Sequence, residues 1–205
     1  MKRFGKPWMA LLLCMSGCSS GPPLHTYVLT PPLGLGPLAA SPASSEDRIL
    51  VRGVLVPDYL DTTDILLRHG GNEVEVSATG RWSERLSQGL TRALATDLQK
   101  RLPAHTVVFD RSSPAQRQVL INVNALDLWR DGRCALAATW TIVDHDASRA
   151  VATGSGTFYS SPIGTTTEVG DARLVDAMTR TVDELADAIA LKIQHGTEGA
   201  GGHAD

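Results

Sequence analysis

The chain has 205 residues and a formal net charge of −3, with 42% hydrophobic and 20% charged residues. This composition is typical of a globular protein of one domain and excludes an intrinsically disordered chain. The weakly acidic balance argues against a nucleic-acid binder, which usually carries a strong basic excess. The charge is uneven, because residues 1–17 hold Lys2, Arg3 and Lys6 and no acid. The remaining chain therefore has 16 basic and 22 acidic side chains, a balance of −6.

The first seventeen residues have the order of a secretory signal peptide. Their basic start is followed by the apolar run 8–15, which is too short to cross about 30 Å of hydrocarbon. The closing residues Met15-Ser16-Gly17-Cys18 resemble the lipobox of bacterial lipoproteins, which implies that Cys18 is lipidated and begins the mature chain. Ser19 stands where an Asp would signal inner-membrane retention, so the resemblance implies an outer-membrane anchor. The alternative is a plain secreted protein in which Cys18 is incidental.

Composition divides the rest of the chain into three parts. Residues 18–46 contain six prolines among Gly, Ser and Ala, which predicts an extended tether behind the lipidated cysteine. Within it, His25–Leu29 is a short β-prone segment that can add an edge strand. Residues 47–195 are predicted to form a single domain, and the Gly-rich residues 196–205 a flexible tail.

The first half of the domain predicts strands and then a helix. Residues 49–56 read as a strand ended by Pro57, and residues 64–68 and 73–76 as a hairpin around a Gly-Gly-Asn turn. Leucines then recur every four residues from Leu86 to Leu102, the stripe of an amphipathic helix. Ser83 is the expected cap of this helix and Pro103 its stop.

The second half predicts strands and a longer helix. Residues 106–109 and 119–124 read as strands, the latter half-buried, and residues 134–143 and 151–159 as an antiparallel hairpin. A stripe from Leu174 to Ile193 predicts the last helix. The expected fold is α/β in the α+β sense, a single domain with one mixed β-sheet, antiparallel hairpins and two main covering helices.

No arrangement of nucleophile, base and orienting group is visible, so the sequence argues against an enzyme and predicts neither metal nor cofactor beyond acyl chains on Cys18. The acids Asp183, Glu184 and Asp187 are interpreted as a solvated helix face, and Asp144-His145-Asp146 as a polar turn. Cys134 has no partner cysteine and is expected to be a small buried hydrophobe.

One segment stands out as a candidate binding surface. Pro57 ends a strand and is followed by Asp58, Tyr59 and Leu60, two of them bulky residues in a connection. Tyr59 and Leu60 are either buried anchors of the loop or an exposed patch that binds a partner. In the second interpretation, Arg68 and Arg81 are possible neighbours.

The run 51–60, Val-Arg-Gly-Val-Leu-Val-Pro-Asp-Tyr-Leu, resembles the PqiC (YmbA-like) family of ABC-type transport auxiliary lipoproteins. A strand ending in Arg68, a turn with Gly and Asn, and Trp82 at the opening of the first helix continue the resemblance. Tyr27-Val28-Leu29 and the lipobox complete its order. The tentative partner-binding residues are Pro57, Asp58, Tyr59, Leu60, Arg68 and Trp82.

The resemblance implies a non-enzymatic lipoprotein that faces the periplasm from the outer membrane of a Gram-negative bacterium. Its implied partners are an MCE-domain (mammalian cell entry) protein that spans the periplasm and inner-membrane transporter components. Its implied role is to dock or complete a conduit that carries lipid between the membranes, with a homo-oligomeric ring as a plausible assembly. The alternatives are a free-standing structural or assembly lipoprotein of the envelope and a periplasmic hydrolase with an unrecognised site.

Overall fold

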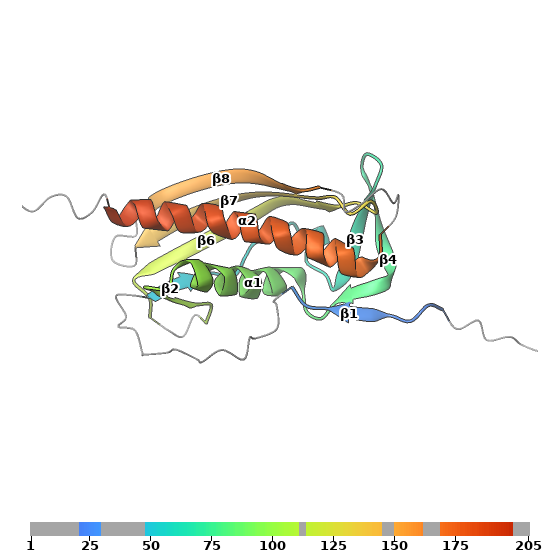
Figure 1. Cartoon of the computed structure of the whole chain (residues 1–205), viewed down its shortest axis with the longest axis horizontal. Helices are drawn as coiled ribbons and strands as arrows, with labels where there is room; N and C mark the ends of the chain where they lie inside the picture. The colour runs from blue at the N-terminus through green and yellow to red at the C-terminus, as the bar shows by residue number, and fades with distance from the viewer. Residues whose placement is uncertain (1–20, 30–47, 111–113, 145–149, 162–168, 199–205) are drawn as a thin grey trace, which may run out of the picture.

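The computed structural model describes residues 21–29, 48–110, 114–144, 150–161 and 169–198 (Figure 1). Within these ranges the chain forms two mixed sheets of five and three strands and two long helices. The expected Cys18 anchor and the turn residues His145 and Asp146 lie outside the described residues.

The larger sheet has the strand order β5-β2-β6-β7-β8. Its strands are β2 (Arg48–Val51), β5 (Thr106–Val108), β6 (Arg117–Leu128), β7 (Cys134–Asp144) and β8 (Ala150–Ser160). The β6–β7–β8 part is antiparallel, whereas β2 pairs in parallel with both β5 and β6.

The smaller sheet has the order β1-β4-β3 and lies at one end of the molecule (Figure 1). It contains β1 (His25–Tyr27), β3 (Asp64–His69) and β4 (Glu73–Trp82). The β3–β4 hairpin turns at Gly70, whose φ of 69° lies in the left-handed region that favours glycine. β1 pairs in parallel with the end of β4, so the predicted edge strand is present.

Both helices cover the same face of the larger sheet (Figure 1). They are α1 (Leu86–Arg101) and α2 (Asp171–Glu198). The leucines of the predicted α1 stripe are all buried, and the chain leaves the helix at Leu102, before Pro103. The α2 stripe packs on β7 and β8 and extends to Glu198, three residues beyond the expected domain boundary.

The two faces of the larger sheet differ because its strands alternate. Val119, Ile121 and Val123 are buried under the helices, whereas Leu120 and Asn122 are exposed on the other face. A β-bulge between Val123 and Ala125 shifts the alternation by one residue, so that the following even-numbered residues point inward. The hydrophobic core therefore lies between the sheet and the two helices.

The mixed α+β fold with two covering helices is confirmed, but its strands are divided between two sheets instead of one. The division depends on non-local pairing, because β4 accepts β1 from the N-terminal segment and β3 as its hairpin partner.

The predicted start of the first helix is wrong. Ser83 does not cap α1, because the helix begins at Leu86 and Arg85 is at the N-cap position. The backbone N–H of Ser83 instead donates to the Tyr27 carbonyl at 2.8 Å. Trp82 does not open the helix either, since it is the last residue of β4 and its N–H donates to the Thr63 carbonyl at 2.7 Å. β4 is therefore six residues longer than the predicted strand, and α1 begins at Leu86.

Candidate partner-binding site

The segment that follows β2 remains attached to the larger sheet. Leu55 donates its N–H to the Ile121 carbonyl at 3.0 Å and accepts from the Val123 N–H at 2.8 Å. Pro57, with φ −55° and ψ 141°, then leads into a single 3-10 turn at Asp58–Leu60, closed by the bond from the Leu60 N–H to the Pro57 carbonyl. The conformation of the candidate segment is therefore fixed by backbone hydrogen bonds.

Of the two interpretations of this segment, the buried anchor applies to Leu60 and the exposed patch applies to Tyr59. The Leu60 side chain is 4% exposed and belongs to the core, whereas that of Tyr59 is 49% exposed. Leu60 is thus the anchor of the loop, and Tyr59 is the aromatic residue that the loop presents to solvent. Asp58, beside it, is also exposed.

Asp61 ties the same turn to the first helix. Its carboxylate accepts a hydrogen bond from the Ser87 N–H at 3.1 Å, near the start of α1, and pairs with Arg85 at 3.3 Å. Burial tends to raise the pKa of Asp61, but the hydrogen bonds from Ser87 and Arg85 outweigh it and the pKa is lowered. Asp61 thereby supplies the acceptor at the helix N-terminus that was expected from Ser83.

Arg68 of β3 lies close to the Tyr59 hydroxyl and pairs with Asp127 of β6. The Arg68 Nε donates to Asp127 Oδ1 at 2.9 Å, so this pair joins β3 to β6. The hydrogen bond to Asp127 raises the pKa of Arg68, burial opposes this, and the Tyr59 hydroxyl contributes in the same direction as Asp127. Tyr59, Arg68 and Asp127 form one cluster, which we call the Tyr59 platform.

The other proposed neighbours take different positions. Trp82 is buried at the end of β4, so its side chain supports the site from within the core. Arg81 pairs with Asp64 at 2.9 Å and donates to the carbonyls of Ser77 and Gly80, which commits it to the smaller sheet. The structure therefore brings Arg68 to Tyr59 but leaves Trp82 and Arg81 in structural roles.

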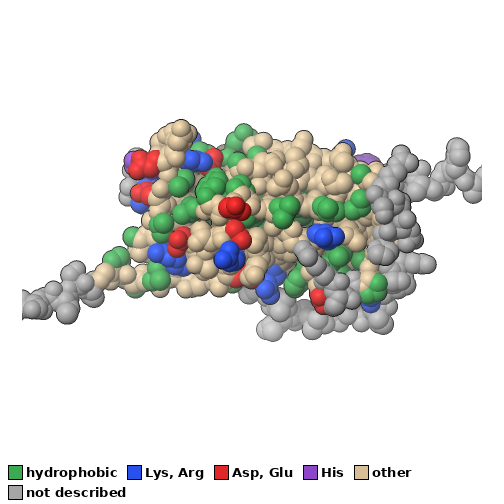
Figure 2. All heavy atoms as spheres, turned by 180° about the vertical axis from the view of Figure 1, so that it is seen from behind, with side chains coloured by type: hydrophobic (Ala, Val, Ile, Leu, Met, Phe, Trp, Pro, Cys, Tyr) green, Lys and Arg blue, Asp and Glu red, His purple; other side chains and the backbone are tan. Residues whose placement is uncertain are grey.

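An open groove of about 290 Å³ lies on the sheet face that the helices leave uncovered. The side chains of Leu55 and Leu120 supply apolar lining, and Asn122, Thr139 and Arg52 supply polar lining. Leu55 is 67% exposed although its backbone is hydrogen-bonded to β6. Figure 2 shows the molecule from the side opposite the helices, so that the uncovered sheet face is toward the viewer. Most of this face is uncharged, and charged side chains are more crowded toward the β3–β4 end.

Sequence reasoning did not identify the groove or Asp127. Leu55 lies within a run of hydrophobic residues, and the sequence alone suggests that all of them are buried. Leu120 is a hydrophobic residue at an outward position of β6, where the next outward residue is polar. Asp127 follows the bulge that redirects β6, so its position opposite Arg68 depends on a local irregularity.

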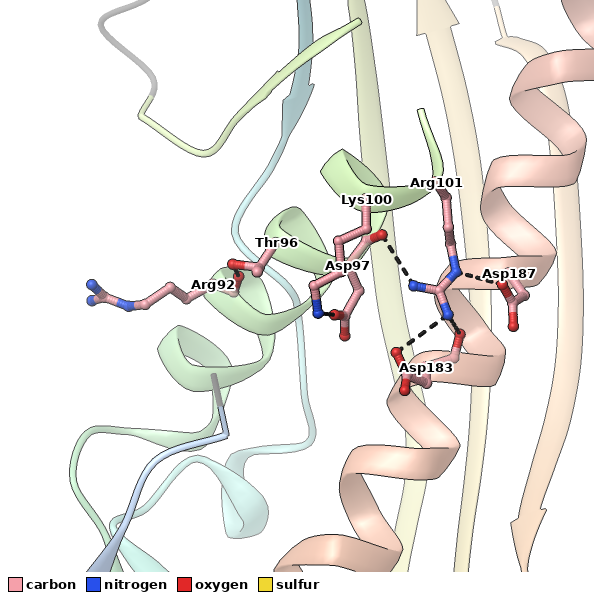
Figure 3. A network of polar contacts seen from close by, with 7 residues as sticks. All are labelled: Arg92, Thr96, Asp97, Lys100, Arg101, Asp183 and Asp187. Atoms are coloured by element: carbon pink, nitrogen blue, oxygen red, sulfur yellow. Dashed lines mark hydrogen bonds and ion pairs between the residues drawn. The ribbon is translucent and has the colours of Figure 1, made fainter. Parts of the chain in front are cut away.

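Two of the acidic residues on the predicted solvated face of α2 form ion pairs with an arginine of α1. Arg101 of α1 bonds Asp183 at 3.2 Å and also pairs with Asp187, as Figure 3 shows. Two of the three candidate carboxylates therefore fasten the helices together. These pairs raise the pKa of Arg101, with the Asp187 hydrogen bond as the largest cause.

Cys134 is buried, as predicted, and its thiol contacts the Thr181 hydroxyl at 3.4 Å. Burial raises the pKa of Cys134 to about 11, which keeps the thiol protonated near neutral pH. In the described part of the chain, no group of three or more His, Cys, Asp or Glu residues is placed to hold a metal ion. No helix there is both long and apolar enough to cross a membrane.

Fold and site together define a two-layer α+β protein whose candidate site is an open surface on the uncovered sheet face. The sequence model of the family described as "ABC-type transport auxiliary lipoprotein component" matches residues 27–190. The chain belongs to this family. Membership in a lipoprotein family supports a location in the cell envelope.

Two of the similar solved structures, the first two described here, share the fold at low sequence identity. A crystal structure of an uncharacterized protein is 19% identical, with a TM-score of 0.65, and covers 83% of this chain and 99% of that chain. Protein XCC0632 from Xanthomonas campestris is 14% identical, with a TM-score of 0.58 over 75% of this chain and 88% of that one. The PelC dodecamer from Paraburkholderia phytofirmans is 15% identical, with a TM-score of 0.43 over 81% and 91%. No curated protein sequence matches the chain.

Proposed function

We propose that the chain is a non-enzymatic outer-membrane lipoprotein of an MCE/ABC-type lipid transport system, where it docks or completes the periplasmic conduit. The observation that carries the proposal is the family match over residues 27–190, which follows a lipobox-like sequence ending at Cys18. The partners are an MCE-domain protein that spans the periplasm and the inner-membrane transporter. A homo-oligomeric ring at the end of the conduit belongs to the same proposal.

The Tyr59 platform is the surface that we assign to the partner. Tyrosine combines a large apolar area with a hydroxyl and loses little conformational entropy on binding, which makes it a frequent interface residue. Here the turn and the Arg68–Asp127 pair hold the segment of Tyr59 in place before any partner arrives. An exposed aromatic residue that is already held in place favours docking, because less freedom is lost on binding.

Capture of the partner tests the proposal directly. The full-length lipidated protein, solubilised in mild detergent and crosslinked, is expected to retain the MCE-domain protein. Tyr59→Ala is expected to lose most of the captured partner with little change in melting temperature, because the ring is half exposed. Leu191→Ala on α2 is the matched control, since Leu191 is also about half exposed but lies on the helix side.

Failure to capture the MCE-domain protein from cells that contain it would favour the free-standing structural or assembly lipoprotein. MCE and permease genes beside the gene for this chain would argue against that alternative. If Tyr59→Ala binds as well as the unsubstituted protein, the platform is not the docking surface.

Cys18→Ala tests the anchor separately. We expect the variant to incorporate no acyl chain and to leave the membrane fraction, because three acyl chains bind a membrane far more firmly than the folded domain alone. Metabolic labelling with a fatty acid and density-gradient separation of the two membranes measure both effects. A processed, unlipidated form that stays with the outer membrane would contradict the prediction.

A further inference from the structure

The outer edge of β8 is long, and no other strand of the described residues pairs with it. β8 has eleven residues, and among the described residues it pairs with β7 alone. An edge strand exposes backbone N–H and C=O groups that can pair with another chain, and proteins usually blunt such edges with charges, prolines or short strands. β8 contains no charged residue and no proline, whereas β5 at the opposite edge of the sheet has three residues.

The five central residues of β8, Thr-Gly-Ser-Gly-Thr at 153–157, read the same in both directions about Ser155. Thr153 and Thr157 are equidistant from this centre, and so are Gly154 and Gly156. Farther out, Ala152 matches Phe158 and Val151 matches Tyr159. An antiparallel copy of the strand would therefore place each residue opposite a suitable neighbour. We propose that two copies of this chain pair antiparallel along β8, centred on Ser155, to join two five-stranded sheets into one.

The side chains of the exposed face fit this register. Thr153 would face Thr157 of the second copy, and Val151 would face Tyr159, which is 68% exposed in the single chain. Thr–Thr and aromatic–β-branched pairs are among the favourable cross-strand combinations. Because the strand has no charged side chain, self-pairing brings no like charges together.

The backbone supports a contact of useful size. A bulge at Val151 interrupts the β7–β8 register, but β8 is regular from Ala152 to Ser160. Alternate residues of an antiparallel pair exchange two hydrogen bonds, so a pairing from Val151 to Tyr159 provides about eight. A typical protein–protein interface contains about ten direct hydrogen bonds.

The inner side of β8 is already occupied by aromatic rings. A Cβ atom on Gly154 would lie 2.4 Å from the Trp140 ring, and one on Gly156 would lie 2.9 Å from the Phe158 ring. The two rings, 6.4 Å apart between centroids, thus cover the glycines from the helix side. The edge is held in an extended, pairing-competent conformation without the partner.

This contact is isologous and closes at two copies. It is independent of the transport role, and a ring would need a second, different contact elsewhere on the chain. The alternative partner for the outer edge of β8 is an extended strand from another protein. In that case two copies of the purified chain would not pair along β8.

Sedimentation equilibrium of the full lipidated chain, in detergent matched to the solvent density, tests the proposal. The chain is expected to sediment as a dimer or as a multiple of dimers. Ser155→Lys places two like charges opposite each other at the centre, and we expect it to weaken dimerisation about tenfold or more, or to halve the mass of a larger assembly. Ser155→Asp is expected to do the same.

A mixture of the two variants gives the sharpest result, because Lys and Asp then meet across the two-fold axis and dimerisation should return. Thr139→Lys is the matched control, since Thr139 lies beside Ser155 on β7, one strand inside the edge, and is also exposed. A single-copy mass for the unsubstituted chain would overturn the proposal. So would a Ser155→Lys mass equal to that of the control, or a mixture that fails to associate.

Discussion

The two faces of the larger sheet are built by the same strands and yet differ in almost every property. The helix-covered face consists of large apolar side chains, and its polar contacts, such as the pairs of Arg101 with the α2 carboxylates, lie at the rim. The uncovered face carries many Thr, Ser, Ala and Asn side chains, together with exposed hydrophobic residues such as Leu55, Leu120 and Tyr159. Stability is therefore concentrated on one face, which leaves the other free to carry function.

The largest expected effect is on the free energy of unfolding, and it compares residues on the two faces of one strand, β7. Leu136 of β7 is fully buried, and Leu136→Ala is expected to lower the free energy of unfolding by about 3 kcal/mol through lost burial and a residual cavity. Thr139→Ala, on the exposed face of the same strand, is expected to change it by less than about 0.5 kcal/mol. Urea denaturation measures both, and equal losses would remove the distinction between the faces.

The pH dependence of stability probes the covered face through Cys134. Burial raises the pKa of its thiol from 9.0 to about 11, so the unfolded chain loses this proton at lower pH than the folded chain. The free energy of unfolding should therefore fall as the pH rises from about 9 to about 11, by up to about 1.4 kcal/mol per pH unit. Cys134→Ala removes this contribution, so its stability should decline less steeply over that window. Identical slopes for the two proteins would contradict the prediction.

The smallest effect concerns the rim between the helices. Arg101→Met is expected to lower the free energy of unfolding by about 1 kcal/mol, because it leaves Asp183 and Asp187 without their shared partner. Arg92→Met is the control, since Arg92 pairs with Glu84 at a more exposed position of α1 and should cost about 0.5 kcal/mol. A salt titration sharpens the test, because added salt screens both pairs and should narrow the difference.

Local patterns predicted the parts of the fold that depend on local geometry. The leucine stripe of α1, the alternation of β6 and the β3–β4 turn follow from periods of 3.6 and 2 residues and from glycine at the turn. The start of α1 was mispredicted because pairing with the distant strand β1 extends β4 to Trp82. In addition, the acceptor for the Ser87 N–H near the start of the helix is Asp61, which lies 26 positions earlier in the chain.

The candidate site was predictable only as a segment. The order Pro57-Asp58-Tyr59-Leu60 marks an unusual connection, but its hydrophobic residues cannot be sorted into buried and exposed without the tertiary packing. The ion pairs Arg68–Asp127 and Arg101–Asp183 join residues more than 50 positions apart, so no local signal indicates either one.

The pairing of β1 with β4 determines how far the protein can work from the membrane. A tether that ended at residue 46 would allow the domain to move freely through much of the periplasm, but the chain is already fixed to the folded body at His25. If Cys18 carries the lipid, six residues lie between the anchor and His25 at the start of β1, so the chain between them reaches at most about 25 Å. The end of the molecule that holds the smaller sheet must then stay close to the bilayer surface (Figure 1), and a partner that arrives from across the periplasm has to come to it.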